Sequence, residues 1–440
     1  MINSIQKINA CRILLKWMLF FLVFSYIYSI KYKYHLHSLV ILGIWGGGLN
    51  ILHFWYKDRY LISKKVWNMV MMLIAFCFLY LIVILINDRV DYFFIKEYVI
   101  LDLLTLVAVY PVVILFRRLY GEMTFPLVAK FVTNAVLLQN VLSVLMFFSP
   151  EINTFLLNLL TQSDLNDVFI EGANGFRLIG FGSAFFSAGI TNSVALILTA
   201  VIINFSILTK KQLLWYILVY LLIFFIGIMM SRTTLVGFVI SLVVFCYKSK
   251  IWELKITSRM RVILKSIIFS CLFVFFVLTT LPSTYTNKLD MIVHFGFEFA
   301  YNYFESGKLE TKSSNGLLKM FDKVPDNLKT WLIGDGLYRN PMNPEMEYYK
   351  NTDVGFLRII HCVGIIGLLY FILFQGFVVS CVIQNNNKIF CITFVLLYVL
   401  FLCLNLKGVT DLFRYLILFF FMTPQAGKNV EKLNVFKLWN

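Results

Sequence analysis

Long runs of apolar residues, separated by short polar segments, make up most of the chain. A membrane-spanning helix needs about 20 consecutive apolar residues, and runs of that length recur along the whole sequence. The pattern predicts about twelve spanning helices, over residues 13–30, 38–56, 67–87, 98–116, 127–149, 183–208, 212–230, 232–247, 262–281, 354–382, 388–406 and 411–424. We therefore expect an all-α polytopic membrane protein, with residues 1–440 forming a single integral membrane domain.

Composition and charge agree with a membrane protein, and the distribution of charge predicts the orientation of the chain in the membrane. Hydrophobic residues make up 60% of the sequence and charged residues 14%, whereas soluble domains are about 25% charged. With the N-terminus inside, 20 lysines and arginines fall in inner segments and 8 in the short outer loops. The positive-inside rule then predicts that both termini are cytoplasmic. The net charge of +16 is explained by this topology, so it indicates no nucleic-acid partner.

Two outer segments are too long to be simple turns. They cover residues 150–182 and 282–353, which are the third and fifth periplasmic loops in this topology. The fifth contains two short amphipathic stretches, Gly316–Phe321 and Leu328–Ile333, which predict helices lying along the membrane surface. Long loops with little regular structure are usually functional, so we expect the chemistry on the outer side.

Two arginines stand out near the third and fourth outer segments. Arg177 lies in the glycine-rich stretch 172–182, where the backbone can approach a bulky ligand and a guanidinium suits phosphate oxygens. The alternative is a structural arginine paired with an acid of the same loop. Arg232 lies between two spans joined by almost no loop, so it is drawn into the outer leaflet. A charged side chain at that depth indicates a functional site, unless it extends to the lipid headgroups.

A second group of polar residues ends the fifth loop and begins the next span. Arg339 follows the turn Gly334–Gly336, and Asp353 stands just before the apolar helix, where plain N-capping is the alternative to a functional role. Arg358 and His361 are three residues apart and share a helix face, which predicts a polar cavity. The alternatives are an acid-paired arginine and a satisfied core histidine. No motif with metal-ligand spacing occurs, so we expect no metal and no cofactor.

Three more charged residues lie inside apolar runs. Lys16 and Lys130 lie near the ends of their runs, where the side chain can reach the headgroups. Asp102 lies near the outer end of the fourth span, and we expect it to pair with a cation of the outer side.

Together these features resemble the Wzy-type polymerases of O-antigen and capsular polysaccharide. The residues that carry the resemblance are Arg177 with its glycines, Ser231-Arg232-Thr233, Trp331–Gly336, Asp353–Arg358, and the glycine pair Gly364 and Gly367. The layout of spans and enlarged loops is also similar over most of the chain. The family often separates an arginine and a glycine by ten residues in both loops. Here eleven residues separate Arg177 from Gly189, and Lys350 stands at the glycine position that follows Arg339.

The resemblance implies a GT-C-like fold and a metal-independent glycosyltransferase without a cofactor. Such an enzyme polymerises undecaprenyl-diphosphate-linked oligosaccharide repeat units into O-antigen or capsular polysaccharide at the periplasmic face of the bacterial inner membrane. Its partners would be the lipid-linked glycan donor and acceptor and the lipid bilayer. The resemblance also allows two protein partners, a flippase and a chain-length regulator.

The same resemblance assigns roles to the candidate residues. Because the leaving group is a diphosphate, we expect Arg177 and Arg232 to hold it, with Arg339 or Arg358 assisting. Asp353, and in second place His361, would deprotonate the acceptor hydroxyl.

Other functions stay open at this point. An O-antigen ligase would share the architecture and usually acts through a histidine of the long outer loop, where His294 is the only one. A lipid-linked oligosaccharide flippase or polysaccharide transporter would predict inverted repeats and paired charges at the membrane midplane. A non-catalytic membrane scaffold is the third alternative.

Overall fold

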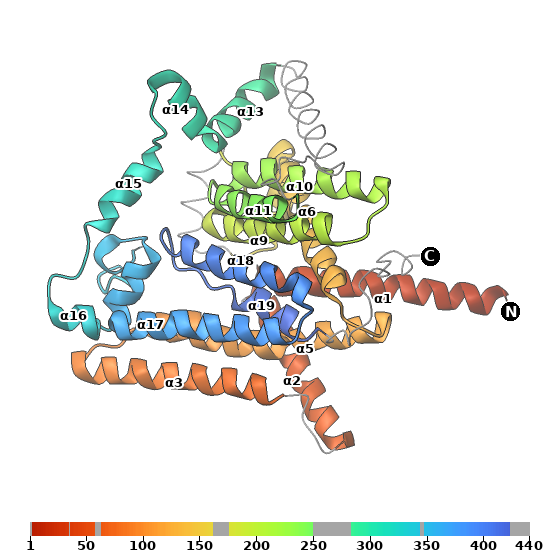
Figure 1. The fold of residues 1–440 in the computed structure, drawn as a ribbon, viewed down its shortest axis with the longest axis horizontal. Helices are drawn as coiled ribbons and strands as arrows, with labels where there is room; N and C mark the ends of the chain where they lie inside the picture. The colour runs from red at the N-terminus through yellow and green to blue at the C-terminus, as the bar shows by residue number, and fades with distance from the viewer. Residues whose placement is uncertain are drawn as a thin grey trace. The chain divides into compact units, whose positions relative to one another are not determined.

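The computed structural model describes residues 2–34, 36–57, 63–161, 176–249, 283–343 and 347–422. These residues are mostly helical (Figure 1), with one short antiparallel pair of strands, β1 (Lys31–Tyr32) and β2 (Leu36–His37). They divide into two compact units. Unit 1 consists of the described residues of Met1–Met123 and Lys312–Pro424, and unit 2 of those of Thr124–Thr311.

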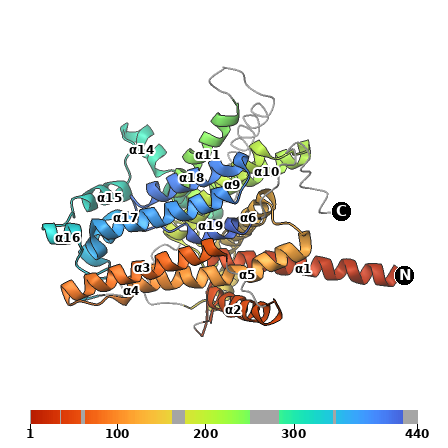
Figure 2. The ribbon, with the colours of Figure 1, turned by 60° about the horizontal axis from the view of Figure 1, so that its bottom comes forward.

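Unit 1 is built from two groups of helices that are far apart in sequence. The first group is α1 (Ile2–Tyr28), α2 (Ser38–Lys57), α3 (Lys64–Asn87), α4 (Tyr92–Ile95), the π-helical turn η1 (Lys96–Ile100) and α5 (Leu101–Tyr120). The second is α15 (Lys312–Phe321), α16 (Leu328–Leu332), the 3₁₀ turn η3 (Tyr349–Asn351), α17 (Gly355–Gln384), α18 (Lys388–Leu404) and α19 (Phe413–Phe420). Helix α17 packs against α3, α16, α18 and α19, so the two groups share one core (Figures 1 and 2).

Unit 2 is organised around a central helix. Its helices are α6 (Phe125–Phe148), α7 (Pro150–Asn158), α9 (Phe185–Phe205), α10 (Lys210–Met230), α11 (Thr234–Ser249), α13 (Ser283–Gly296) and α14 (Glu298–Ser306). Helix α9 packs against α6, α10 and α11 and is buried over most of its length. The backbone of Gly237 approaches Ser193 so closely that a Cβ there would lie 2.3 Å from the serine Cα. Small residues of this kind let membrane helices pack tightly.

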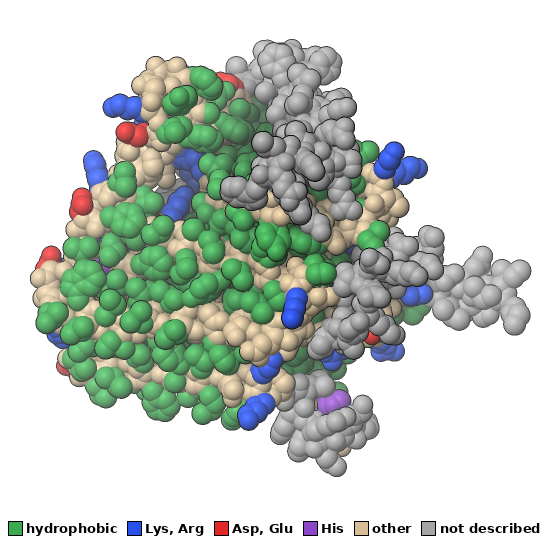
Figure 3. All heavy atoms as spheres, in the orientation of Figure 1, with side chains coloured by type: hydrophobic (Ala, Val, Ile, Leu, Met, Phe, Trp, Pro, Cys, Tyr) green, Lys and Arg blue, Asp and Glu red, His purple; other side chains and the backbone are tan. Residues whose placement is uncertain are grey.

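The helices have the character of membrane spans. Helix α3 buries one face, with Met69, Phe76 and Tyr80 inside, and exposes an equally apolar second face that includes Trp67 and Phe78. Hydrophobic side chains also dominate the visible surface over α3 (Figure 3). A helix that is apolar on all sides fits a lipid environment on the side that no protein covers.

Seven helices among the described residues are long and apolar enough to cross a membrane. They are Cys11–Tyr28, Lys64–Asn87, Tyr92–Tyr120, Phe125–Phe148, Phe185–Phe205, Lys210–Met230 and Gly355–Gln384, and each coincides with a predicted span. Three shorter apolar helices, Ser38–His53, Thr234–Tyr247 and Lys388–Leu404, coincide with three further predictions. The chain is therefore a helical multi-pass membrane protein. The predicted span 262–281 lies outside the described residues.

The predicted span over 411–424 is wrong in the part that the structure describes, which ends at residue 422. Helix α19 has only eight residues, from Phe413 to Phe420, which is about 12 Å of helix and too short to cross a bilayer. Nearly all of its side chains are buried, and it packs against α5 and α17. An apolar run buried by protein has the same composition as one that faces lipid, which explains the error.

The predicted amphipathic stretches of the fifth loop are confirmed as helices. Residues 316–321 lie in α15 and residues 328–332 form α16. The sequence pattern did not predict α7, α13 or α14, because each is short and mixes polar with aromatic residues. Within the third loop, residues 162–175 lie outside the described residues.

Candidate functional site

A break in α17 fixes the loop that leads to Arg339. The helix is interrupted at Gly364, which has a φ of +66°. Just before the break, the carbonyl oxygens of His361 and Cys362 accept hydrogen bonds from the backbone N–H groups of Asp335 (2.7 Å) and Gly336 (3.0 Å). Polar backbone groups inside a membrane protein need such partners, and here the loop supplies them.

Close contact makes glycine necessary at this break. A Cβ at Gly364 would lie 2.1 Å from the carbonyl oxygen of Leu332, which belongs to α16. The loop is therefore held directly on the membrane helix that carries Arg358.

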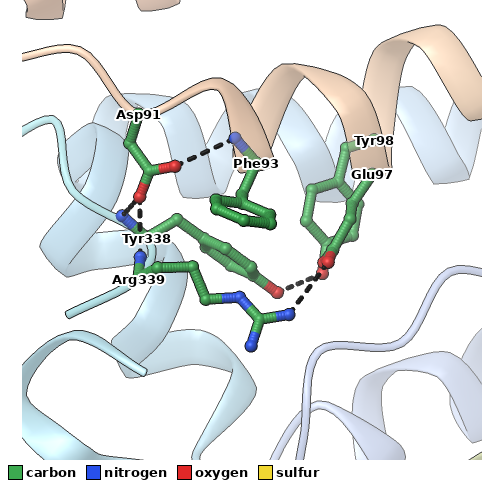
Figure 4. A network of polar contacts seen from close by, with 6 residues as sticks. All are labelled: Asp91, Phe93, Glu97, Tyr98, Tyr338 and Arg339. Atoms are coloured by element: carbon green, nitrogen blue, oxygen red, sulfur yellow. Dashed lines mark hydrogen bonds and ion pairs between the residues drawn. The ribbon is translucent and has the colours of Figure 1, made fainter. Parts of the chain in front are cut away.

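Asp91 holds the next two residues of the same loop (Figure 4). Its carboxylate is 7% exposed and accepts the backbone N–H groups of Tyr338 (2.8 Å) and Arg339 (2.7 Å) on Oδ2. The other oxygen, Oδ1, accepts the N–H of Phe93 at 2.9 Å and so begins α4. One carboxylate thus connects the start of the α4–α5 helix to the loop around residue 338.

The side chains of these loop residues are also held in place. The hydroxyl oxygens of Tyr98 and Tyr338 lie 2.5 Å apart, and Arg339 Nη2 donates to Glu97 Oε1 at 3.1 Å (Figure 4). Burial raises the pKa of Tyr338, although the nearby Arg358 acts against this, so the hydroxyl stays neutral.

Arg339 and Arg358 share one aromatic ring, and we call these two arginines with Tyr338 and Tyr348 the Tyr348 cluster. The Cζ atom of Arg358 lies 3.3 Å from the centre of the Tyr348 ring and 4.3 Å from that of Tyr338. The Cζ atom of Arg339 lies 4.6 Å from the Tyr348 centre. Arg358 is 7% exposed, its Nε has no hydrogen-bond partner, and among the described residues it forms no ion pair. The acid-paired alternative for Arg358 is therefore not observed in this part of the chain.

Unit 2 contains a similar arrangement, the Phe295 cluster of Arg177, Arg232, Phe295 and Glu298. The Cζ atoms of Arg177 and Arg232 lie 4.4 and 4.7 Å from the centre of the Phe295 ring. Arg232 forms an ion pair with Glu298. Arg177 forms none among the described residues, and its buried Nε has no hydrogen-bond partner. Burial lowers the pKa of Arg177, and the neighbouring Arg232 lowers it further.

Local contacts bring these two arginines together. The backbone N–H of Leu178 donates to the carbonyl of Met229 at 3.1 Å, which ties the segment of Arg177 to the end of α10. Gln139 of α6 donates to the carbonyl of Phe181 at 2.9 Å and holds the same segment from a second helix. Arg232 is the second residue after α10, next to the C-cap Ser231, so both guanidinium groups reach Phe295 from neighbouring backbone positions.

The two candidate proton acceptors have different surroundings. Asp353 is exposed, and the N-cap of α17 is Val354, without a side-chain cap, so the N-cap interpretation of Asp353 is wrong. His361 is 1% exposed, and its Nε2 lies 2.9 Å from the carbonyl oxygen of Lys323. Its Nδ1 is buried without a partner, so the expectation of a satisfied core histidine holds for one of the two ring nitrogens.

His294, the residue of the ligase alternative, is an exposed side chain of α13. Its ring stacks on that of Tyr301, with the centroids 4.7 Å apart. Within the described ranges, no group of three or more His, Cys, Asp or Glu side chains is placed to hold a metal ion.

The sequence identified the four arginines but not the residues that hold them. Asp91, Glu97, Tyr348, Phe295 and Glu298 were all missed. Each lies next to other aromatic residues, as in Asp91-Tyr92-Phe93-Phe94 and Phe295–Phe299. An acidic residue beside aromatic residues in an outer segment was therefore the sequence feature that could have identified them.

The two clusters place their arginines in the same way, although their other residues differ. Each has two guanidinium groups on one aromatic ring, with one arginine paired to a glutamate and the other without an acid partner among the described residues. Aromatic rings hold a guanidinium without neutralising it, so each cluster can bind an anion. No protein-family model, curated protein or solved structure matches the chain. The geometry of the two clusters is therefore the available guide to function.

Proposed function

We propose that the chain is a glycosyltransferase that polymerises undecaprenyl-diphosphate-linked oligosaccharide repeat units into O-antigen or capsular polysaccharide. In this proposal it spans the bacterial inner membrane several times and acts at the periplasmic face. The observation that carries the proposal is the presence of two arginine pairs, each with one arginine that lacks an acid partner among the described residues.

The number of anion sites fits the number of substrates. The reaction joins two lipid-linked glycans, and each carries a diphosphate at the level of the lipid headgroups. We assign the donor diphosphate to Arg177 and Arg232, and the acceptor diphosphate to Arg339 and Arg358. Fixed guanidinium groups stabilise the charge that develops on the leaving diphosphate without a metal ion.

The chemical step needs a group that takes a proton. The acceptor hydroxyl attacks the anomeric carbon of the donor sugar, the bond from that carbon to the diphosphate oxygen breaks, and the hydroxyl proton passes to a base. Asp353 is the preferred base because its carboxylate is exposed and lies just before the first turn of α17, which carries Arg358. His361 is second, because burial restricts access to its ring.

Glycan profiles of a deletion strain complemented with variants test the proposal. We expect Arg177→Ala and Arg358→Ala to give a lipid core with a single repeat unit and no long ladder. The matched controls Lys308→Ala and Lys329→Ala remove exposed lysines, one in each unit, and should keep the full ladder. Arg232→Ala is a poorer test, because it also leaves Glu298 without its ion pair.

Other outcomes would contradict the proposal. A normal ladder in both arginine variants would exclude these residues as substrate ligands. If deletion leaves complete repeat units on the lipid carrier, with none transferred to the core, the chain is a ligase. If those repeat units are trapped on the cytoplasmic face, it is a flippase. Mass spectrometry of the lipid-linked sugars distinguishes these products.

A further inference from the structure

The carboxylate of Asp335 connects two segments of unit 1, the helix α16 and the turn η3. Asp335 lies between Gly334 and Gly336, in the loop that follows α16. Its Oδ1 accepts a hydrogen bond from the hydroxyl of Thr330 in α16 at 2.7 Å. Its Oδ2 accepts one from the hydroxyl of Tyr349 in η3 at 3.1 Å. Each carboxylate oxygen therefore holds a different segment.

The turn η3 has a backbone that its surroundings must hold. Lys350 and Asn351 have φ angles of +58° and +50°, in the left-handed region that residues other than glycine adopt uncommonly. Such a conformation persists only where neighbouring contacts determine it. Lys323 Nζ donates to the carbonyl oxygen of Asn351 at 2.6 Å, and the N–H of Tyr349 donates to the carbonyl oxygen of Tyr338 at 3.2 Å. The shape of η3 thus depends on its contacts with the rest of unit 1.

Two consecutive tyrosines lead from η3 to the arginines of the Tyr348 cluster. Tyr348 has an extended backbone, with φ −81° and ψ 152°, so its side chain and that of Tyr349 point to different sides. The ring of Tyr349 lies edge-on to that of His361, with the centroids 5.9 Å apart. The ring of Tyr348 lies 3.3 Å from the Arg358 Cζ atom, and its backbone pairs with that of Arg339 in an antiparallel bridge. Holding one ring therefore also fixes the direction of the other.

We infer that Asp335 is a positioning residue for anion binding at the Tyr348 cluster. It holds the hydroxyl of Tyr349, and through the backbone this places the ring of Tyr348 against both arginines. Asp335 does not bind the anion itself, because an ionised carboxylate has no hydrogen to donate to a phosphate oxygen. The inference rests on the proposed function, which makes this anion the diphosphate of the acceptor.

Binding of inorganic pyrophosphate to the purified full-length protein in detergent tests this role. Isothermal titration calorimetry gives the affinity, and the binding that Arg358→Ala removes belongs to the Tyr348 cluster. Tyr349→Phe removes only the hydroxyl that donates to Asp335, so this variant should fold and elute as the wild type does. We expect the affinity of the cluster to fall about tenfold, as for the loss of one hydrogen bond to a charged group. Tyr34→Phe, at a tyrosine that is 86% exposed, is the matched control and should bind as the wild type does.

A double substitution separates positioning from a general loss of structure. Tyr348→Leu removes the ring and leaves both arginines in place. If Asp335 acts through this ring, adding Tyr349→Phe to Tyr348→Leu should weaken pyrophosphate binding no further. The same loss of affinity from Tyr349→Phe with and without the Tyr348 ring would overturn the inference.

Two other results would also overturn it. One is an unchanged affinity in Tyr349→Phe, and the other is the absence of any pyrophosphate binding that depends on Arg358, because there would then be no anion site to position. The glycan ladder decides the proposed function separately. A normal ladder in Arg358→Ala would count against the polymerase role of this cluster, whereas the pyrophosphate affinities would still decide the role of Asp335.

Discussion

The guanidinium carbon of Arg358 lies 3.3 Å from the centre of the Tyr348 ring, and no acid among the described residues forms an ion pair with this arginine. A cation over an aromatic ring gains about 0.5–2 kcal/mol, most when water is excluded. This interaction holds the side chain in position and leaves its charge available to a ligand. Arg177 has the same relation to Phe295 in unit 2, at 4.4 Å.

Arg358→Lys should remove most of the polymer although it keeps the positive charge. A lysine ammonium cannot stack as a plane on Tyr348 or bind two phosphate oxygens with one rigid group. We expect polymer to fall at least about tenfold, which corresponds to about 1.4 kcal/mol of lost binding. Densitometry of the ladder measures it, with Lys329→Arg as the control. A normal ladder in Arg358→Lys would mean that a point charge is sufficient there.

The sequence predicted the elements that local composition determines. Most apolar runs are helices close to their expected bounds. Arg177 and Arg232, which the sequence singled out separately, lie on one ring in the structure. Phe295 could not be predicted, because it reaches these arginines only through the packing of α13 on α10. The error at α19 has a related cause, because the composition of a short apolar segment does not show which helices pack around it.

Asp91 shows in the same way that contacts between distant parts of the chain cannot be predicted from the local sequence. Its position before Tyr92 indicates a helix cap, and one carboxylate oxygen does cap α4. The second oxygen binds the backbone of residues 338 and 339, which are far away in sequence. Likewise, Gly364 was recognisable as one of a glycine pair, but the break at this position depends on its contact with Leu332.

Asp91→Ala should destabilise the protein and also abolish polymer. The change leaves the N–H groups of Phe93, Tyr338 and Arg339 without their acceptor. At about 1 kcal/mol or more for each lost bond, we expect a loss of about 3 kcal/mol. Asp91→Asn keeps one acceptor oxygen and should lose less. Thermal unfolding in detergent measures both variants, and Asp322→Ala, at an exposed carboxylate, is the control. Equal unfolding temperatures for Asp91→Ala and this control would refute the role of Asp91.

Gly364→Ala should be among the most damaging alanine substitutions in α17. The residue has a φ of +66°, and the new Cβ would lie 2.1 Å from the carbonyl oxygen of Leu332. Backbone strain and overpacking together cost about 3 kcal/mol or more. Gly316→Ala is the matched control, because nothing lies within 4 Å of its Cβ position in α15, and it should stabilise the helix by about 0.5–1 kcal/mol. Similar folded yields for the two variants would show that α17 tolerates a regular helix at residue 364.

Acidification should destabilise unit 1 through His37. Burial, together with the positive charges of Lys31, Arg414 and Lys96, lowers the pKa of His37 from 6.5 to about 4. Between these two values the unfolded chain binds a proton that the folded protein does not, so stability falls as the pH drops from about 6.5 towards 4. At about pH 5 the loss is about 1 kcal/mol, after allowance for solvent screening. The unfolding temperature, compared at neutral pH and about pH 5, measures it. His37→Asn has no titrating ring, so its unfolding temperature should fall less on acidification. An equal fall in the variant and the wild type would assign the pH dependence to other groups.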